Sequence, residues 1–173
     1  MAGKELGLPF DPIEIAGAHW EDHFGASSAM KVATSIMRAQ QLLLTRYDEL
    51  LRPYSLTFAR YEALVLLVFS RRGELPMRVI GERLMVHPTS ATNIVDRLTK
   101  QGYVTRRPNP ADGRGVLAAV TSEGRDAVRQ ATKELMAIDF GLGPLEEGHR
   151  AQVTEALREL RVAAGDFKPG PEH

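Results

Sequence analysis

Apolar residues recur at steps of three and four from Ser28 onward, which is the spacing of one face of an α-helix. The pattern stops at Arg52, because Pro53 disfavours helical backbone in the residue before it. Residues 1–27 instead hold prolines and glycines around a possible short helix, PIEIAGAHWEDHF. We therefore predict an N-terminal arm over 1–27, which packs only if a partner surface receives it, and one long helix over 28–52.

Three further helices follow in the pattern. The segment FARYEALVLLVFSRR is apolar nearly all round, so we expect a central helix, capped by the hydroxyl of Thr57 and ending at Gly73. Pro76 suits the first turn of a short helix, PMRVIGERL. A break at MVHP then leads to a helix over TSATNIVDRLTKQG, which Gly102 ends in a left-handed cap.

A β-hairpin is expected next. YVTR and VLAAVT are short β-compatible runs on either side of RRPNPADGRG (residues 106–115), in which Asp-Gly is expected to supply the reversal. Two short helices, a turn between them and a hairpin form a winged helix-turn-helix. We predict a mainly α fold with a two- or three-stranded wing, whose winged lobe spans residues 53–121.

The remaining chain returns to helix. Apolar residues line one helix from Ser122, glycines and a proline interrupt it near residues 141–144, and a last helix has Val153, Leu157 and Leu160 on its apolar face. Residues 122–165 are predicted to be two helices, and 166–173 a loose tail.

Charge is uneven along the chain. The net charge is zero, but residues 71–114 hold nine basic and four acidic side chains, a balance of +5, and the rest holds 13 basic and 18 acidic, a balance of −5. The chain has no cysteine, which removes thiolate chemistry and Cys-based zinc sites. With no membrane-length apolar run and no signal-peptide pattern, we expect a cytoplasmic protein without membrane contact.

The helix after MVHP has two faces. Ala91, Ile94, Val95 and Leu98 form an apolar side, so the opposite side is polar and exposed. That polar side consists of Thr89, Ser90, Thr92, Asn93, Asp96, Arg97 and Lys100. Short side chains at the start of a helix let it enter a DNA major groove, where hydroxyls and amides can bind base edges or phosphates. A solvated face on a structural helix is the alternative.

The hairpin tip carries three arginines, Arg106, Arg107 and Arg114, with little nearby acid. Because prolines stiffen the loop, these guanidinium groups are expected to enter a minor groove or bind the phosphate backbone. Asp112 is expected to orient a neighbouring guanidinium, since phosphate would repel its carboxylate. A solubilising surface loop is the alternative.

These residues resemble the multiple antibiotic resistance regulator (MarR) family of bacterial transcription factors. The resemblance rests on RVIGERLMVHPTSATNIVDRLTKQGYVTRRPNPADGRGVLAAVTSEGR, especially its Asp-x-Arg wing and the following T-x-x-G, and extends over residues 28–163. It implies a homodimer, joined by the first and the last two predicted helices, that binds a pseudo-palindromic operator and represses a neighbouring gene. The implied recognition residues are Pro88, Thr89, Ser90, Thr92, Asn93 and Arg97, with Arg114 in the wing.

The resemblance also implies a small aromatic or anionic effector that binds between the dimerisation helices and the winged lobe and loosens DNA. The residues suggested for that pocket are Trp20, Arg46, Tyr47, Arg60 and Tyr61, although the arginines have acidic neighbours and the rings suit a core. The arm is longer than in many members, which leaves open whether it swaps across the dimer or closes the pocket.

A dimer also follows from the residues, because the apolar stripes of the first, fifth and sixth predicted helices are too long for one winged lobe to cover. A monomer with folded-back helices is the alternative. Paired copies would present two recognition helices roughly 34 Å apart, one turn of DNA.

Other functions have weaker support. His19 and His23 lack a third ligand, so we expect no metal and no cofactor. A hydrolase using His87, Ser90 and Asp96 is disfavoured, because a helix directs Ser90 and Asp96 apart and no Gly-x-Ser-x-Gly elbow occurs. The remaining alternative is a winged-helix adaptor that binds protein instead of DNA, which the positive central segment disfavours.

Overall fold

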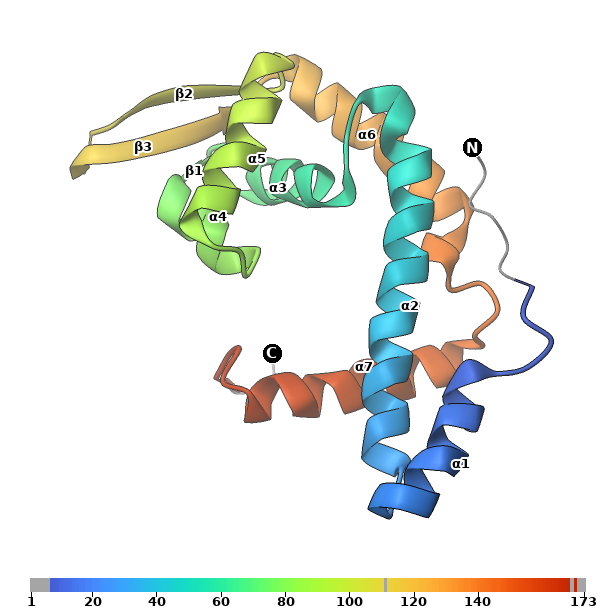
Figure 1. The fold of residues 1–173 in the computed structure, drawn as a ribbon. Coiled ribbons are helices and arrows are strands. Elements are labelled where there is room, and N and C mark those ends of the chain that lie inside the picture. Colours follow the sequence, from blue (N-terminus) through green and yellow to red (C-terminus); the bar gives the residue numbers. More distant parts are fainter. Residues whose placement is uncertain (1–6, 111, 169, 171–173) are drawn as a thin grey trace.

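The structure, a computed structural model, describes residues 7–110, 112–168 and 170, and only the backbone of Arg114. The helices are α1 (Pro12–Phe24), α2 (Ser28–Leu51), α3 (Phe58–Phe69), α4 (Met77–Arg83), α5 (Pro88–Lys100), α6 (Ser122–Ala137) and α7 (Glu147–Ala163). The strands are β1 (Glu74–Pro76), β2 (Val104–Asn109) and β3 (Asp112–Val120), and two 3₁₀ turns lie at Arg52–Tyr54 and Asp139–Gly141. The predicted fold class, mainly helical with a three-stranded wing, is confirmed (Figure 1).

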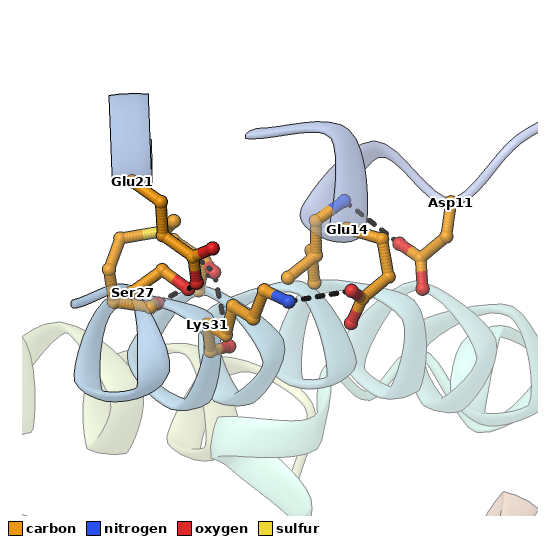
Figure 2. Close-up of polar contacts among 8 residues, drawn as sticks. Asp11, Glu14, Glu21, Ser27 and Lys31 are labelled. Atoms are coloured by element: carbon orange, nitrogen blue, oxygen red, sulfur yellow. Dashed lines mark hydrogen bonds and ion pairs between the residues drawn. The ribbon is translucent and has the colours of Figure 1, made fainter. Parts of the chain in front are cut away.

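The predicted arm helix forms as α1 and lies beside the first half of α2 (Figure 1). Asp11 caps it by accepting a 2.8 Å hydrogen bond from the Ile13 amide, and Pro12 suits its first turn. We expected the arm to pack only against a partner. This expectation was wrong for the polar side of the arm, which contacts residues of its own chain. Figure 2 shows the main contact, a 2.6 Å ion pair between Lys31 and Glu14.

A tight joint connects α2 to α3. Helix α2 ends at Leu51, one residue before the predicted end. Arg52 keeps helical backbone although Pro53 follows it, the chain continues as the 3₁₀ turn Arg52–Tyr54, and Ser55 has a left-handed φ of 56°. Thr57 is the N-cap residue of α3, but its hydroxyl accepts no cap hydrogen bond. The Phe58 amide instead donates to the Asp48 carboxylate at 2.7 Å, so the end of α2 caps the start of α3.

Helix α3 is central, as predicted, but shorter. It ends at Phe69 instead of near Gly73, because Ser70 is already extended and its hydroxyl donates to the Leu67 carbonyl at 2.7 Å. Leu64 and Leu67 are fully buried in one core cluster. The cluster also contains Tyr47 and Leu51 of α2, Ile80 of α4, Val95 and Leu98 of α5, Val104 and Ala118 of the sheet and Leu135 of α6.

The sheet is antiparallel in the order β1-β3-β2, and the hairpin β2–β3 is the wing. Asn109 lies opposite Asp112, so the Asp-Gly pair lies in β3 and the prediction that it makes the reversal was wrong. Pro110 directly follows Asn109, and a proline favours that second position of a turn because its φ is already fixed. The reversal therefore falls at the proline.

The T-x-x-G element, which runs from Thr121 to Gly124, forms the start of α6. The Thr121 hydroxyl accepts a 3.0 Å hydrogen bond from the Gly124 amide, which caps the helix. A Cβ atom on Gly124 would lie 2.3 Å from the Tyr103 carbonyl oxygen, so only glycine fits there. This contact fixes the direction in which α6 leaves the wing.

Candidate nucleic-acid interface

Helix α5 has the two faces that the sequence predicted. Ala91, Val95 and Leu98 are buried and attach it to the core, and Ile94 is partly buried. The opposite side is open, and its exposed residues are Pro88, Thr89, Ser90, Asn93, Arg97 and Lys100. The helix therefore presents a slim polar edge that none of the described residues covers. Its contact with DNA remains a prediction.

Two hydrogen bonds organise the start of α5. The Thr89 amide donates to Nδ1 of His87 at 3.3 Å, so His87 caps the helix, a role that the sequence did not suggest. The Thr92 hydroxyl donates to the Pro88 carbonyl at 3.0 Å. Because this bond uses the hydroxyl proton of Thr92, the side chains left to donate at the helix start are those of Thr89, Ser90 and Asn93.

The wing arginines are paired more than the sequence suggested. Arg106 forms an ion pair with Asp96 of α5, and Arg107 forms one with Glu74 of β1. The expectation of little nearby acid was therefore wrong for both. The hydrogen bond from Arg107 holds the pKa of Glu74 below its usual value and raises the pKa of Arg107. These pairs anchor the wing to the recognition helix and to the opposite edge of the sheet.

Asp112 folds back over the wing. A Cβ atom on Gly115 would lie 2.8 Å from the Asp112 carboxylate, so this glycine makes room for it. Arg114 falls within β3, but its side chain lies outside the described residues. The predicted pairing of Asp112 with a guanidinium group and the DNA contact of Arg114 therefore stay predictions.

Unpaired positive charge remains on the recognition helix. Within the part of the chain that the structure describes, Arg97 and Lys100 form no ion pair, and both are exposed. Arg78 of α4, by contrast, pairs with Glu82 one turn later. A groove of about 440 Å³ between α4 and the wing is lined by Arg78, Arg106 and Asp112 among others. Helix α5 contacts both α4 and β2, the elements that flank this groove, so its polar edge lies next to the groove and the wing.

Tyr47 and Tyr61, predicted for an effector pocket, are core residues. The Tyr47 hydroxyl donates to the Phe140 carbonyl at 2.6 Å, and the Tyr61 and Thr132 hydroxyls are 2.9 Å apart. Burial raises the pKa of Tyr47. The rings of Tyr47 and Phe58 lie 4.7 Å apart between α2 and α3. These two tyrosines join the helices of the core.

The other three suggested effector residues lie elsewhere. Arg46 is exposed, with Glu49 at 4.0 Å, and Arg60 donates to the Ser55 carbonyl at 3.0 Å. Trp20 packs on Phe24 beside the start of α2, which is about 30 Å along that helix from Tyr47. The chain alone therefore does not gather the five residues, and α1 does not close a pocket near Tyr47.

A different hollow lies at the joint between α2 and the winged lobe. Its volume is about 470 Å³, and its lining residues are Asp48, Arg52, Ser55, Leu56, Thr57, Arg60 and Gln101. The Gln101 side-chain amide donates to the Ser55 carbonyl at 2.5 Å, and its own oxygen is buried without a partner. The sequence indicated only Arg60 here. The other lining residues lie within residues 48–57, except Gln101, which the fold brings to the joint from the end of α5.

The histidine pair and the hydrolase residues have ordinary structural roles. His23 donates from Nδ1 to the His19 carbonyl at 2.8 Å. His87 caps α5 and Asp96 pairs with Arg106, so neither serves Ser90. Among the described residues no group of three His, Asp or Glu side chains is placed to hold a metal. Nor do the described helices include one long and apolar enough to cross a membrane.

Comparisons with known proteins agree on one family. The MarR family model matches residues 54–115. The HTH-type transcriptional regulator SarZ of Staphylococcus saprophyticus is 30% identical over 118 residues, which cover 68% of this chain and 79% of SarZ. Sco5413, a MarR family transcriptional regulator of Streptomyces coelicolor, has 59% sequence identity and a TM-score of 0.76, over 82% of this chain and 98% of its own.

Sco3205, another MarR family regulator of Streptomyces coelicolor, was solved in complex with DNA. It has 27% identity and a TM-score of 0.70, over 80% of this chain and 87% of its own. These relatives are transcriptional regulators and not enzymes. The sequence motif, the winged fold and the matched relatives together show that this chain belongs to the MarR family of transcriptional regulators.

Proposed function

We propose that two copies of this chain form a repressor that binds a pseudo-palindromic operator through α5 and the wing. The observation that carries the proposal is the exposed polar edge of α5 beside a wing that is anchored to the same helix by the Arg106–Asp96 pair. This arrangement fits a helix in a major groove and a hairpin along the adjacent backbone. The complex of the relative Sco3205 with DNA supports it.

The proposed dimer rests on apolar helix faces that the chain leaves open. Helix α7 has no buried residue, and α2 has buried residues only near its C-terminal end. The exposed large apolar side chains on the two helices are Val32, Met37, Leu42, Leu44, Val153 and Leu160. Their burial against a second copy would stabilise both chains and set the two α5 helices one DNA turn apart.

Arg97→Ala tests the proposed DNA contact. The experiment measures the affinity of the protein for duplex DNA from next to its own gene by fluorescence anisotropy. Loss of a guanidinium group that binds DNA is expected to weaken binding by about 1–3 kcal/mol. Lys133→Ala is the matched control, because Lys133 is an exposed cation on α6. Equal affinity of wild type and Arg97→Ala would count against the proposed interface.

Arg114→Ala tests the wing separately. The expected result is weaker binding and a shallower dependence of affinity on salt, because each phosphate contact releases counterions. Unchanged binding at about 150 mM salt, where the Debye length is near 8 Å, would remove Arg114 from the interface. If no duplex binds at all, the protein adaptor becomes the better account of the winged lobe.

A small anionic effector would act at the hollow between α2 and the winged lobe. Arg52 and Arg60 supply positive charge there, and Gln101 and Ser55 supply polar groups. The hydrogen bonds from Phe58 to Asp48 and from Gln101 to Ser55 both connect α2 and its end to the winged lobe. A ligand that shifts either bond would alter the angle between α2 and α5. Benzoate, as a simple aromatic carboxylate, is expected to raise the Tm of wild type and weaken DNA binding, and to do neither in Arg60→Ala.

A further inference from the structure

The arm helix α1 has one polar side, and that side is attached to its own chain. Lys31 pairs with Glu14 at 2.6 Å, and the Ser27 hydroxyl donates to Glu21 at 2.5 Å (Figure 2). Between these contacts Gly17 lies under the Lys31 side chain, where an added Cβ atom would meet Cε at 2.1 Å. Helix α1 is therefore held in one register along the first half of α2.

Within the described part of the chain, nothing covers the apolar side of the arm. The rings of Trp20 and Phe24 contact each other in a tilted arrangement with their centres 5.0 Å apart, yet the two side chains are 39% and 75% exposed. Leu8, Phe10 and Ile15 of the same segment are exposed as well. Only Gly17 of α1 is buried. A helix of 13 residues is marginal by itself in water, and burial of its apolar face is what stabilises such a helix in proteins.

Exposed apolar side chains also lie on α2, against which α1 packs, and on α7. Val32 and Met37 of α2 follow the arm on the same half of that helix, and both are exposed. Val153 and Leu160 of α7 are exposed too, and α7 stands apart from the lobe formed by α3, α4 and α5 (Figure 1). All of these residues belong to the region proposed above to join the two copies. A patch of this extent marks a protein interface.

We infer that α1 is part of the dimer interface, where Trp20 and Phe24 pack against the uncovered helix faces of a second copy. The arm stays on its own α2 through Lys31 and Glu14, so it widens the interface without exchanging places with the partner's arm. A symmetric pair would bury both copies of the same patch. This inference rests on the proposed dimer and adds a segment that the resemblance to the family did not assign.

Trp20 provides the test on the unmodified protein, because it is the single tryptophan of the chain. The oligomeric state is measured by sedimentation over a dilution series, and Trp20 emission and its quenching by acrylamide are measured on the same samples. The expected result is a blue-shifted, protected tryptophan in the dimer, which becomes red-shifted and quenchable as the dimer dissociates. A dimer whose Trp20 stays as quenchable as in the monomer overturns the inference and leaves the proposed function standing.

A pair of variants provides the second test. Phe24→Ser removes an exposed ring from the arm, and Phe69→Ser removes one that is 82% exposed on the winged lobe. Because each dimer would bury Phe24 twice, the first change is expected to raise the dimer Kd by a factor on the order of 100 and the second to leave it unchanged. Circular dichroism checks that each variant folds.

The outcomes separate the two proposals. Equal dimer Kd values for Phe24→Ser and Phe69→Ser overturn the role of the arm. A wild-type chain that is monomeric at every concentration overturns the proposed dimer and the arm inference together. If Phe24→Ser does not fold, the fluorescence of the unmodified chain still decides the question.

Discussion

The winged lobe and the flanking helices are stabilised in different ways. In the lobe, Leu64, Leu67, Ile80, Val95 and Leu98 are all fully buried within one chain. The arm, the first half of α2 and α7 have large apolar side chains in solvent, such as Val32 at 60% and Leu160 at 58% exposure. The lobe is thus complete in one copy. The flanking helices have apolar faces that need another surface.

The two regions suit two different tasks, DNA recognition in the lobe and dimer formation in the flanking helices. A rigid lobe holds α5 and the wing in a fixed relation, which DNA recognition requires. In the proposed dimer, the open faces of the flanking helices would set the spacing between two such lobes. The joint at Asp48, Ser55 and Gln101 connects the two regions through a few hydrogen bonds. A change of angle at that joint would also move Tyr47 and Leu51 of α2, which pack in the same core cluster as the lobe residues.

Removal of a core side chain from the lobe is expected to have the largest effect. Leu98→Ala leaves a cavity in the cluster that attaches α5 to α3, which costs about 3–4 kcal/mol of unfolding free energy. Urea denaturation measures this loss, and it should be the same at all protein concentrations. A loss that changed strongly with protein concentration would mean that the lobe core also depends on the second copy.

Removal of an apolar side chain from α7 is expected to weaken the dimer and to change the stability of the single chain very little. Leu160→Ser should leave the unfolding of a dissociated chain nearly unchanged, since Leu160 contacts water there. It should weaken the dimer by about 2–3 kcal/mol, because the side chain is buried twice in a pair. Sedimentation equilibrium gives the dimer Kd. Identical Kd values for wild type and variant would take α7 out of the interface at this position.

A smaller effect is expected from Lys100→Ala on the recognition helix. Lys100 is exposed and forms no ion pair with the described residues, so its amino group is open to a phosphate. Loss of one phosphate contact lowers the slope of log affinity against log salt by about 0.9. Binding titrations at several salt concentrations measure this slope. A slope that does not change would place Lys100 outside the DNA contact.

The smallest effect is expected at the anchor of the wing. Arg107 lowers the pKa of Glu74 in the folded chain, so the pair stabilises the fold above the ordinary glutamate pKa near 4.5. This contribution is lost as the pH falls through the lowered pKa. Glu74→Gln should therefore be less stable than wild type at neutral pH and equally stable in acid. Urea unfolding of both proteins over that range measures the difference, and a constant difference would contradict the assignment.

Local patterns were enough to predict the order of the elements. Apolar residues at helical spacing indicated α2, α3, α5 and α6, and the buried side of α5 is the one that Ala91, Val95 and Leu98 indicated. Gly102 has the left-handed φ expected of a helix end, at 77°. Each of these depends on neighbours within a few residues. Such features are visible in sequence because the cause and its effect lie in the same segment.

Contacts between distant segments were not predicted. Arg107 and Glu74 are 33 residues apart, and Asp48 caps a helix that begins ten residues later. These pairs exist because the core brings the segments together, and no local pattern contains that information. Tyr47 and Tyr61 have the residue types of a ligand pocket, but both rings are buried in the core, and their hydroxyls bond to the Phe140 carbonyl and to Thr132, which lie far along the chain. The hairpin turn was misplaced because proline and Asp-Gly both favour turns.

Hydroxyl-radical footprinting of DNA from next to the gene tests the central claim most directly. Two α5 helices and two wings on one duplex predict two related protected half-sites with centres about 10 base pairs apart, or a multiple of that spacing. Protection of both half-sites should be lost together when Arg97→Ala replaces the wild-type protein. A single protected half-site, or protection that Arg97→Ala leaves intact, would contradict the account of paired lobes that bind DNA through α5.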